Sequence, residues 1–265
     1  MTGKSRPDLE AGYNNRAACP DHPAVMARWK AEAEATRAAE PPTVLRYGPG
    51  PRETIDLFEA GPGAPVVAFL HGGYWQALDP SWFSWIAPPL LARGISVAIP
   101  AYDLCPQVSL ATIIEQMRTA IALLTERAAT PPVLVGHSAG GHLAACLLSE
   151  GLAGTAVSIS GVFDLRPLVH TSINTALRLD PAEAARLSPL GWTVPEGAVL
   201  DCLVGGGETT EFIRQSRMMA EAWGAAGADT RFEALTDLDH FTVLDPLAAA
   251  DSALVRRIAE LALSA

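Results

Sequence analysis

PPVLVGHSAGGHLAACLLSE, residues 131–150, is the stretch that decides the fold. Residues 133–135 form a short β-branched and apolar run that is typical of a buried parallel strand. From Leu143 to Leu147 apolar residues recur at helical spacing. Between these two patterns, residues 136–140 read GHSAG, and the glycines on either side allow a strand and a helix to approach closely. The stretch therefore predicts a strand, a sharp turn and a helix, with Ser138 at the apex.

Apolar strand-like runs alternate with helical patterns along most of the chain. This alternation predicts an α/β fold with a mostly parallel, doubly wound sheet flanked by helices. The expected strands cover residues 66–70, 95–99, 133–135, 156–159, 199–204 and 231–235, and the expected helices cover residues 23–39, 110–124, 210–226 and 246–263.

The length of 265 residues and a hydrophobic content of 49% predict a single domain over residues 1–265. Residues 1–41 are expected to form a helical arm against this domain. Residues 162–196 interrupt the alternation with short helical pieces and several prolines. They are expected to form a small cap-like insert over the sheet, and a plain connecting helix is the alternative that this pattern leaves open.

Charge and cysteine content restrict the classes of partner. A formal net charge of −10 argues against nucleic acid and anionic membrane, because both attract a basic face. Four scattered cysteines predict buried reduced thiols rather than disulfides or a zinc site. The first segment of the chain is polar, and no apolar stretch reaches 18 residues. The chain is therefore expected to be cytoplasmic. We expect a small-molecule substrate and leave a homodimer open.

A serine hydroxyl needs a base to take its proton and a carboxylate to orient that base. At a serine turn of this kind, the three groups follow in the chain order serine, acid, histidine. His240 follows the last expected strand and precedes the final expected helix, so it is the predicted base. The five other histidines lie in the arm, beside the serine, before a glycine pair or in the insert: His22, His71, His137, His142 and His170.

The acid should follow the expected strand over residues 199–204. Glu208 is the first carboxylate beyond that strand and is preferred. Glu211 would lie in the first turn of the next helix, where favouring the positive helix terminus is a sufficient role for it. Asp237 and Asp239 share a short loop with the histidine that they would have to orient, so they are weaker candidates.

An oxyanion hole needs backbone N–H groups that point to the developing negative charge. We expect one such group from Ala139, directly after the serine. The others are expected from Gly72 and Gly73, which follow the strand over residues 66–70. Tyr74 and Trp75 come next and are expected to line a substrate pocket for an aromatic or apolar group.

Five motifs together resemble the arylformamidase (kynurenine formamidase) branch of the α/β-hydrolases, over most of the length. They are HGGYWQ at 71–76, GHSAGGHL at 136–143, EFIRQS at 211–216, a histidine after the last strand and YNNR at 13–16. The resemblance implies hydrolysis of N-formylkynurenine or a related N-formyl aryl amine through an acyl-enzyme on Ser138. The chain departs from the branch in having glutamate where aspartate is usual.

The resemblance implies a reaction without a cofactor. The chain also lacks the histidine-rich pattern of the unrelated metal-dependent formamidases, so we expect no metal site. Two alternatives stay open at this point. The same three catalytic groups would serve a carboxylesterase that acts on short acyl or aryl esters. A non-catalytic receptor on the same fold is disfavoured by the apparent completeness of the site.

Overall fold

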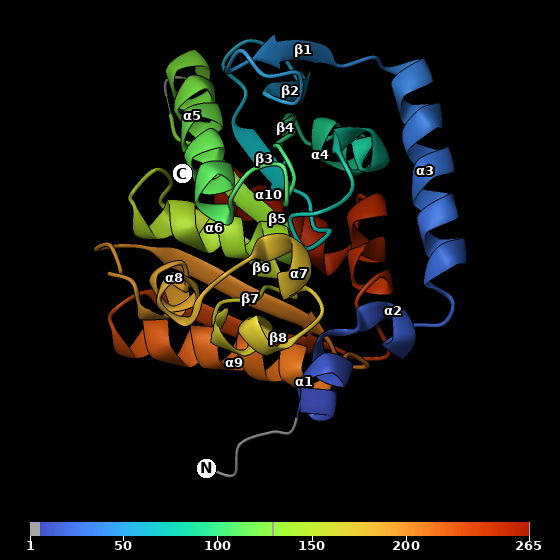
Figure 1. Ribbon diagram of the computed structural model, residues 1–265. Helices are drawn as coiled ribbons and strands as arrows, with labels where there is room; N and C mark the ends of the chain where they lie inside the picture. Colours follow the sequence, from blue (N-terminus) through green and yellow to red (C-terminus); the bar gives the residue numbers. More distant parts are fainter. Residues whose placement is uncertain (1–5, 129, 265) are drawn as a thin grey trace.

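A mostly parallel sheet forms the centre of the computed structural model, which describes residues 6–128 and 130–264 (Figure 1). Its eight strands lie in the order β1-β2-β4-β3-β5-β6-β7-β8. β1 pairs antiparallel with β2, and β2 pairs antiparallel with β4. All pairs from β4 across to β8 are parallel. The strands are β1 (Thr43–Arg46), β2 (Thr54–Phe58), β3 (Val66–Leu70), β4 (Ser96–Pro100), β5 (Val133–His137), β6 (Thr155–Ile159), β7 (Val199–Gly205) and β8 (Asp229–Leu235).

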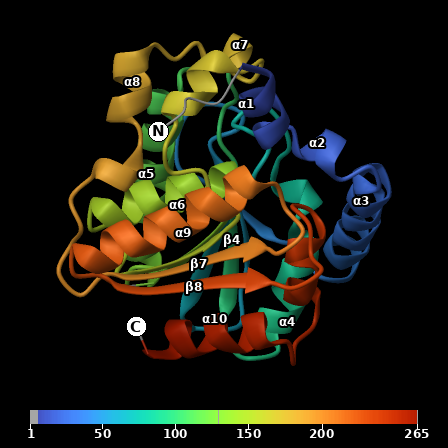
Figure 2. The same ribbon diagram turned by 90° about the horizontal axis from the view of Figure 1, so that it is seen from below.

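Helices cover both faces of the sheet, as Figure 2 shows. On one face lie α5 (Leu110–Ala128), α6 (Ala139–Ser149) and α9 (Thr210–Ala225), and on the other lie α3 (His22–Ala39), α4 (Ala87–Leu91) and α10 (Ala253–Ser264). Every residue of β4 and β5 is buried, because the sheet is covered from both sides. The predicted α/β fold with a mostly parallel sheet is confirmed.

Two features differ from the sequence prediction. The strands β1 and β2 were not predicted. β1 has only four residues and is largely exposed, and the charged Asp56 interrupts the apolar residues of β2. The final helix begins at Ala253 rather than at residue 246. The Ser252 hydroxyl accepts a hydrogen bond from the Val255 N–H and caps α10, whereas residues 242–248 form the 3₁₀ helix η5 (Thr242–Ala248).

The amino-terminal arm consists of α1 (Arg6–Tyr13), α2 (Asn15–Ala18) and α3. α1 contacts α9 and the segment between β6 and β7. That segment contains η3 (Arg166–His170), α7 (Asn174–Leu177), α8 (Pro181–Arg186) and η4 (Pro189–Gly191). Between β3 and α4 lie η1 (Pro80–Trp82) and η2 (Ser84–Ile86). The arm and the 162–196 segment therefore meet at one edge of the sheet.

Over the described residues, no helix is both long and apolar enough to cross a membrane. Cys19, Cys105, Cys146 and Cys202 are buried and form no disulfide. No group of three or more His, Cys, Asp or Glu side chains lies close enough to hold a metal ion in the same part of the chain.

Three buried histidines make the stability depend on pH. Burial lowers the pKa of His71 and of His142 to about 4, and lowers the pKa of His137 well below its usual value. In the unfolded chain these side chains bind protons near pH 6.5, whereas in the folded protein they stay neutral. The contribution of these neutral histidines to stability is therefore full about one pH unit above 6.5 and is lost as the pH falls through 6.5.

We expect the free energy of unfolding to fall between pH 7.5 and pH 5, by up to about 1.4 kcal/mol per pH unit for each histidine. Urea unfolding at several pH values in this range measures the slope. His142→Gln removes one titrating group and should flatten the slope by about a third. A free energy of unfolding that is constant from pH 7.5 to pH 5 would contradict the assignment.

Candidate active site

Ser138 lies in the turn between β5 and α6 with φ of 54° and ψ of −117°, a backbone conformation that is strained for any residue except glycine. Backbone hydrogen bonds hold it there. Its N–H donates to the Ile159 carbonyl at 2.9 Å, and its carbonyl accepts from the Gly141 N–H at 2.9 Å. A Cβ on Gly140 would lie 1.9 Å from the Leu70 carbonyl oxygen, so only glycine lets α6 cross the sheet this closely. The turn therefore presents the Ser138 side chain at the carboxyl edge of the sheet.

Glu208 and His240 are joined by a hydrogen bond in which His240 Nδ1 donates to Glu208 Oε2 at 2.6 Å. The other carboxylate oxygen of Glu208 accepts from the Ser160 hydroxyl and, at 2.8 Å, from the Gly205 N–H. The Glu208 side chain is completely buried. These bonds fix the carboxylate, and the carboxylate fixes both the tautomer and the plane of the histidine ring.

His137 holds the histidine loop from the other side. Its Nε2 donates to the His240 carbonyl at 2.9 Å, and the two rings lie 4.9 Å apart between centroids. Burial keeps the pKa of His137 well below its usual value, so its ring is neutral and serves as a fixed donor. The sequence offered no sign of this role, because the bond joins residues far apart in the chain.

Ser138 and His240 line the same pocket, which has a volume of about 470 Å³. No hydrogen bond joins the Ser138 hydroxyl to His240 within residues 6–128 and 130–264. Such bonds are often loose in an unliganded hydrolase and tighten when substrate binds. The arrangement thus supplies a nucleophile and an oriented base on one pocket wall.

Glu211, the alternative acid, faces another part of the molecule. Its Oε1 accepts from the Tyr13 hydroxyl at 2.7 Å and from Arg214 at 2.5 Å. Asp239 is also engaged locally, since its Oδ1 accepts from the N–H groups of Phe241 and Thr242, both at 2.8 Å. The structure therefore brings Glu208, and neither of these two carboxylates, to the histidine.

The loop after β3 passes directly beside the serine. A Cβ on Gly72 would lie 3.1 Å from the Ser138 Cβ. Gly73 has φ of +107°, and a Cβ there would lie 2.4 Å from the Ala77 carbonyl oxygen, so a side chain is excluded. In the described chain the N–H groups of Gly73 and Ala139 donate no hydrogen bond. These groups are thus available to an oxyanion.

Tyr74 and Trp75 differ in position, although both were expected at the pocket. Tyr74 lines the pocket, and its hydroxyl donates to the Tyr13 carbonyl at 2.7 Å. Trp75 is fully buried, does not line the pocket and packs edge-on against His142 at 5.0 Å. Both residues have positive φ, of 50° and 57°, so the chain turns inward and the large indole enters the core. The expectation that Trp75 lines the pocket is therefore corrected.

Most of the remaining pocket wall comes from two segments whose place at the pocket no local sequence pattern predicts. The arm contributes Tyr13, Asn15, Arg16, Met26 and Trp29, and the segment between β6 and β7 contributes Ser172 and Ile173. The motif YNNR at 13–16 was visible in the sequence. Its position at the pocket was not, because it depends on contacts across almost 200 residues.

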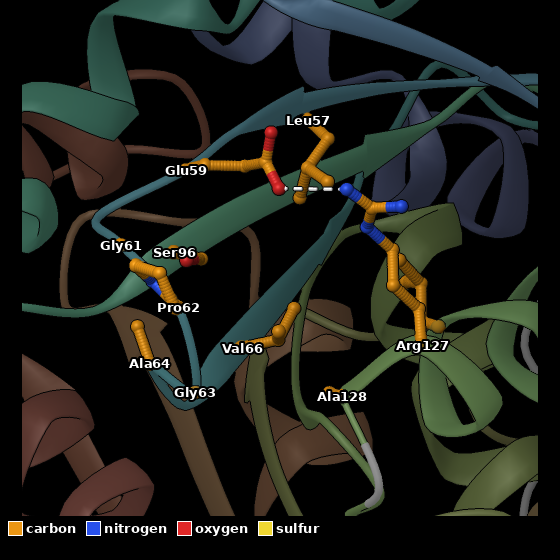
Figure 3. Close-up of a pocket in the computed structure, with 11 residues that line it drawn as sticks. Leu57, Glu59, Gly61, Pro62, Gly63, Ala64, Val66, Ser96, Arg127 and Ala128 are labelled. Carbon is orange, nitrogen blue, oxygen red and sulfur yellow. Dashed lines mark hydrogen bonds and ion pairs between the residues drawn. The ribbon is translucent and has the colours of Figure 1, made fainter.

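A second pocket of about 550 Å³ lies at the opposite edge, where β3 and β4 begin and α5 ends (Figure 3). Its polar groups include an ion pair at 2.8 Å between Arg127 and Glu59. Histidine and cysteine are absent from its described lining. It therefore offers no nucleophile with a base.

A serine on a strained strand–helix turn, with a carboxylate-oriented histidine beyond the last strand, defines a serine hydrolase. Comparisons with known proteins agree with this class. Residues 67–261 match the model of the alpha/beta hydrolase family. Kynurenine formamidase of Drosophila melanogaster is 33% identical over 236 residues, covering 80% of this chain and 78% of that protein. Kynurenine formamidase of Danio rerio is 30% identical over 219 residues, covering 76% and 75%.

A crystal structure of a protein provisionally described as a thioesterase, from a Silicibacter species, is 35% identical with a TM-score of 0.87. It covers 95% of this chain and 98% of that one. A thermophilic carboxylesterase from a metagenomic library, at 16% identity and a TM-score of 0.70 over 98% and 96% of the two chains, shares the fold. The chain belongs to the α/β-hydrolase family and, within it, to the kynurenine formamidase branch.

The two candidate acids can be separated by substitution. Glu208→Gln should lower kcat for p-nitrophenyl acetate by about 10³- to 10⁴-fold, because the amide no longer fixes the histidine tautomer. Glu211→Gln should act mainly on stability, lowering the free energy of unfolding by about 1–3 kcal/mol through its weakened bonds to Tyr13 and Arg214.

Steady-state kinetics and urea unfolding on both variants test this assignment. Glu211→Gln is the matched control, since it makes the same chemical change three residues away. A Glu208→Gln enzyme with near wild-type kcat, or a Glu211→Gln enzyme that loses activity by the larger factor, would reverse the assignment.

Proposed function

We propose that this protein hydrolyses the formamide bond of an N-formyl aryl amine, with N-formylkynurenine as the leading substrate. In this proposal Ser138 is the nucleophile, His240 is the base and Glu208 orients the base. The observation that carries it is the pairing of His240 with Glu208 at 2.6 Å beside a pocket that Ser138 also lines. The relatives named kynurenine formamidase, aligned over about three quarters of their length, supply the substrate class.

The reaction follows from these positions. His240 Nε2 takes the Ser138 proton as the serine oxygen bonds to the formyl carbon. The resulting oxyanion accepts hydrogen bonds from the N–H groups of Gly72, Gly73 and Ala139. His240 then gives its proton to the amine nitrogen, the C–N bond breaks and the aryl amine leaves. Water attacks the formyl-enzyme with His240 again as base, which releases formate and restores the serine.

The pocket lining supports an aromatic substrate. Four aromatic residues line the pocket that Ser138 also lines: Tyr13, Trp29, Tyr74 and Phe241. Aromatic rings pack well against such walls in offset or edge-to-face arrangements. A volume of about 470 Å³ is within the range of small-molecule sites.

A carboxylesterase is the second candidate, because the same three groups cleave esters. The esterase fold of several solved structures and the relative provisionally described as a thioesterase favour it. The formamidase proposal has the stronger support, because the formamidase relatives match over most of both chains.

We further propose that the enzyme is cytoplasmic and acts on a small molecule without a cofactor. The four unpaired buried cysteines support a reducing compartment. The net charge of −10 supports a role away from nucleic acid and anionic membrane.

A comparison of substrates tests the proposal. We expect a higher kcat/KM for N-formylkynurenine than for p-nitrophenyl acetate, and a further loss of about tenfold or more for p-nitrophenyl butyrate, because a formyl-selective pocket has little room beyond a hydrogen atom. Purified Ser138→Ala protein supplies the blank. A clear preference for the butyrate ester would replace the formamidase with the carboxylesterase.

A further inference from the structure

Asn15 and Arg16, the first two residues of α2, line the pocket together with Ser138 and His240. Neither has a part in the bond-breaking chemistry. Their position is fixed, because the preceding residues are tied to the body of the protein. The Thr209 hydroxyl donates to the Gly12 carbonyl at 2.7 Å, and Tyr13 bonds to Glu211 through its hydroxyl and to Tyr74 through its carbonyl.

Asn15 carries a buried amide without a partner. The residue is only 5% exposed, and its Nδ2 makes no hydrogen bond within the described part of the chain. The indole Nε1 of Trp29, which lines the same pocket, is likewise buried and unpaired among the described residues. Unpaired buried donors are costly, and donors on a pocket wall are satisfied when a ligand supplies an acceptor. Both groups are donors, so the ligand atom that they favour is an oxygen acceptor.

Arg16 adds a positive charge to the pocket wall. Among the described residues that line the pocket, it has the only guanidinium or ammonium group. Its side chain makes no hydrogen bond or ion pair within residues 6–128 and 130–264. Glu10 lines the same pocket and makes no ion pair with Arg16 within the described residues; its carboxylate accepts from the Ser172 N–H at 2.8 Å and from the Ser172 hydroxyl at 2.5 Å.

We propose that Arg16 and Asn15 form a subsite for a carboxylate on the substrate, so that the enzyme selects N-formyl aryl amines with an anionic side chain. A guanidinium matches the two oxygens of a carboxylate, and the Asn15 amide supplies a further donor. Glu10, on the same pocket wall, would complement a neighbouring ammonium group. The three groups together fit the charged end of an α-amino acid. This inference rests on the proposed function for the identity of the reaction, but the subsite can be measured without it.

Product-like inhibitors measure the subsite through ester hydrolysis. L-kynurenine and 2-aminoacetophenone share the aryl amine and ketone, and only the first has an amino-acid end. Against p-nitrophenyl acetate, the wild type should have a Ki at least about tenfold lower for L-kynurenine. Arg16→Gln and Asn15→Asp should each remove most of that difference, and Arg16→Lys should keep part of it. Arg46→Gln, on exposed β1 away from the pocket, makes the same charge change and should keep all of it.

The same comparison applies to substrates. We expect the ratio of kcat/KM for N-formylkynurenine to that for N-(2-acetylphenyl)formamide to fall about tenfold in Arg16→Gln, mainly through KM. Thermal unfolding of each variant checks that the arm is still docked. Equal losses of kcat/KM for both compounds would show that Arg16 only supports the structure, and no loss for either compound would show that it does not meet the carboxylate. Either result overturns the subsite.

The two proposals fail in different ways. If the wild type cleaves neither formamide but the Ki difference is present and depends on Arg16, the formamidase assignment is wrong and the subsite stands. If the wild type cleaves both formamides and shows no Ki difference, the subsite is wrong and the formamidase assignment stands.

Discussion

Ser138 keeps a backbone conformation that is costly for a residue with a side chain, and the surrounding structure holds it there. The Ile159 carbonyl accepts a hydrogen bond from the Ser138 N–H. The helix α6 crosses β3 so closely that a Cβ on Gly140 would clash with the Leu70 carbonyl oxygen. Because the strands from β3 to β8 are parallel, their carboxyl ends meet at this edge. The oxyanion loop, the serine, the carboxylate and the histidine follow four of these strands and so converge without further arrangement.

The amino-terminal arm completes the pocket that this edge begins. Tyr13 connects the arm to α9, since its hydroxyl donates to Glu211 and accepts from Gln215 at 2.9 Å. Gln215 in turn accepts from the N–H groups of Phe163 and Asp164 in the segment after β6. One buried network therefore positions the arm and that segment against the same helix. The consequence is that EFIRQS at 211–216 serves mainly to hold the walls of the pocket, while Glu208 just before it orients the histidine.

The sequence predicted the parts of the molecule that local patterns encode. Five of the six predicted strands, β3 to β7, are largely buried apolar runs, and the sixth, β8, is a partly exposed edge strand. The order serine, acid, histidine follows from the turn at Ser138. Contacts between residues that are distant in sequence could not be predicted from such local patterns. The Tyr13–Glu211 bond spans 198 positions, and Ser160 reaches Glu208 only because β6 and β7 are neighbours. Trp75 was misplaced because two successive positive φ angles reverse the direction expected for its side chain.

Hydrolysis at this site requires Ser138 to be an activated nucleophile, and covalent labelling tests that directly. A fluorophosphonate probe followed by peptide mass spectrometry should place a single modification on Ser138, because the serine that His240 activates attacks phosphorus as it attacks a carbonyl. Labelling should be absent in Ser138→Ala. Folded wild-type protein that stays unlabelled, or that carries the probe on a different residue, would contradict the account.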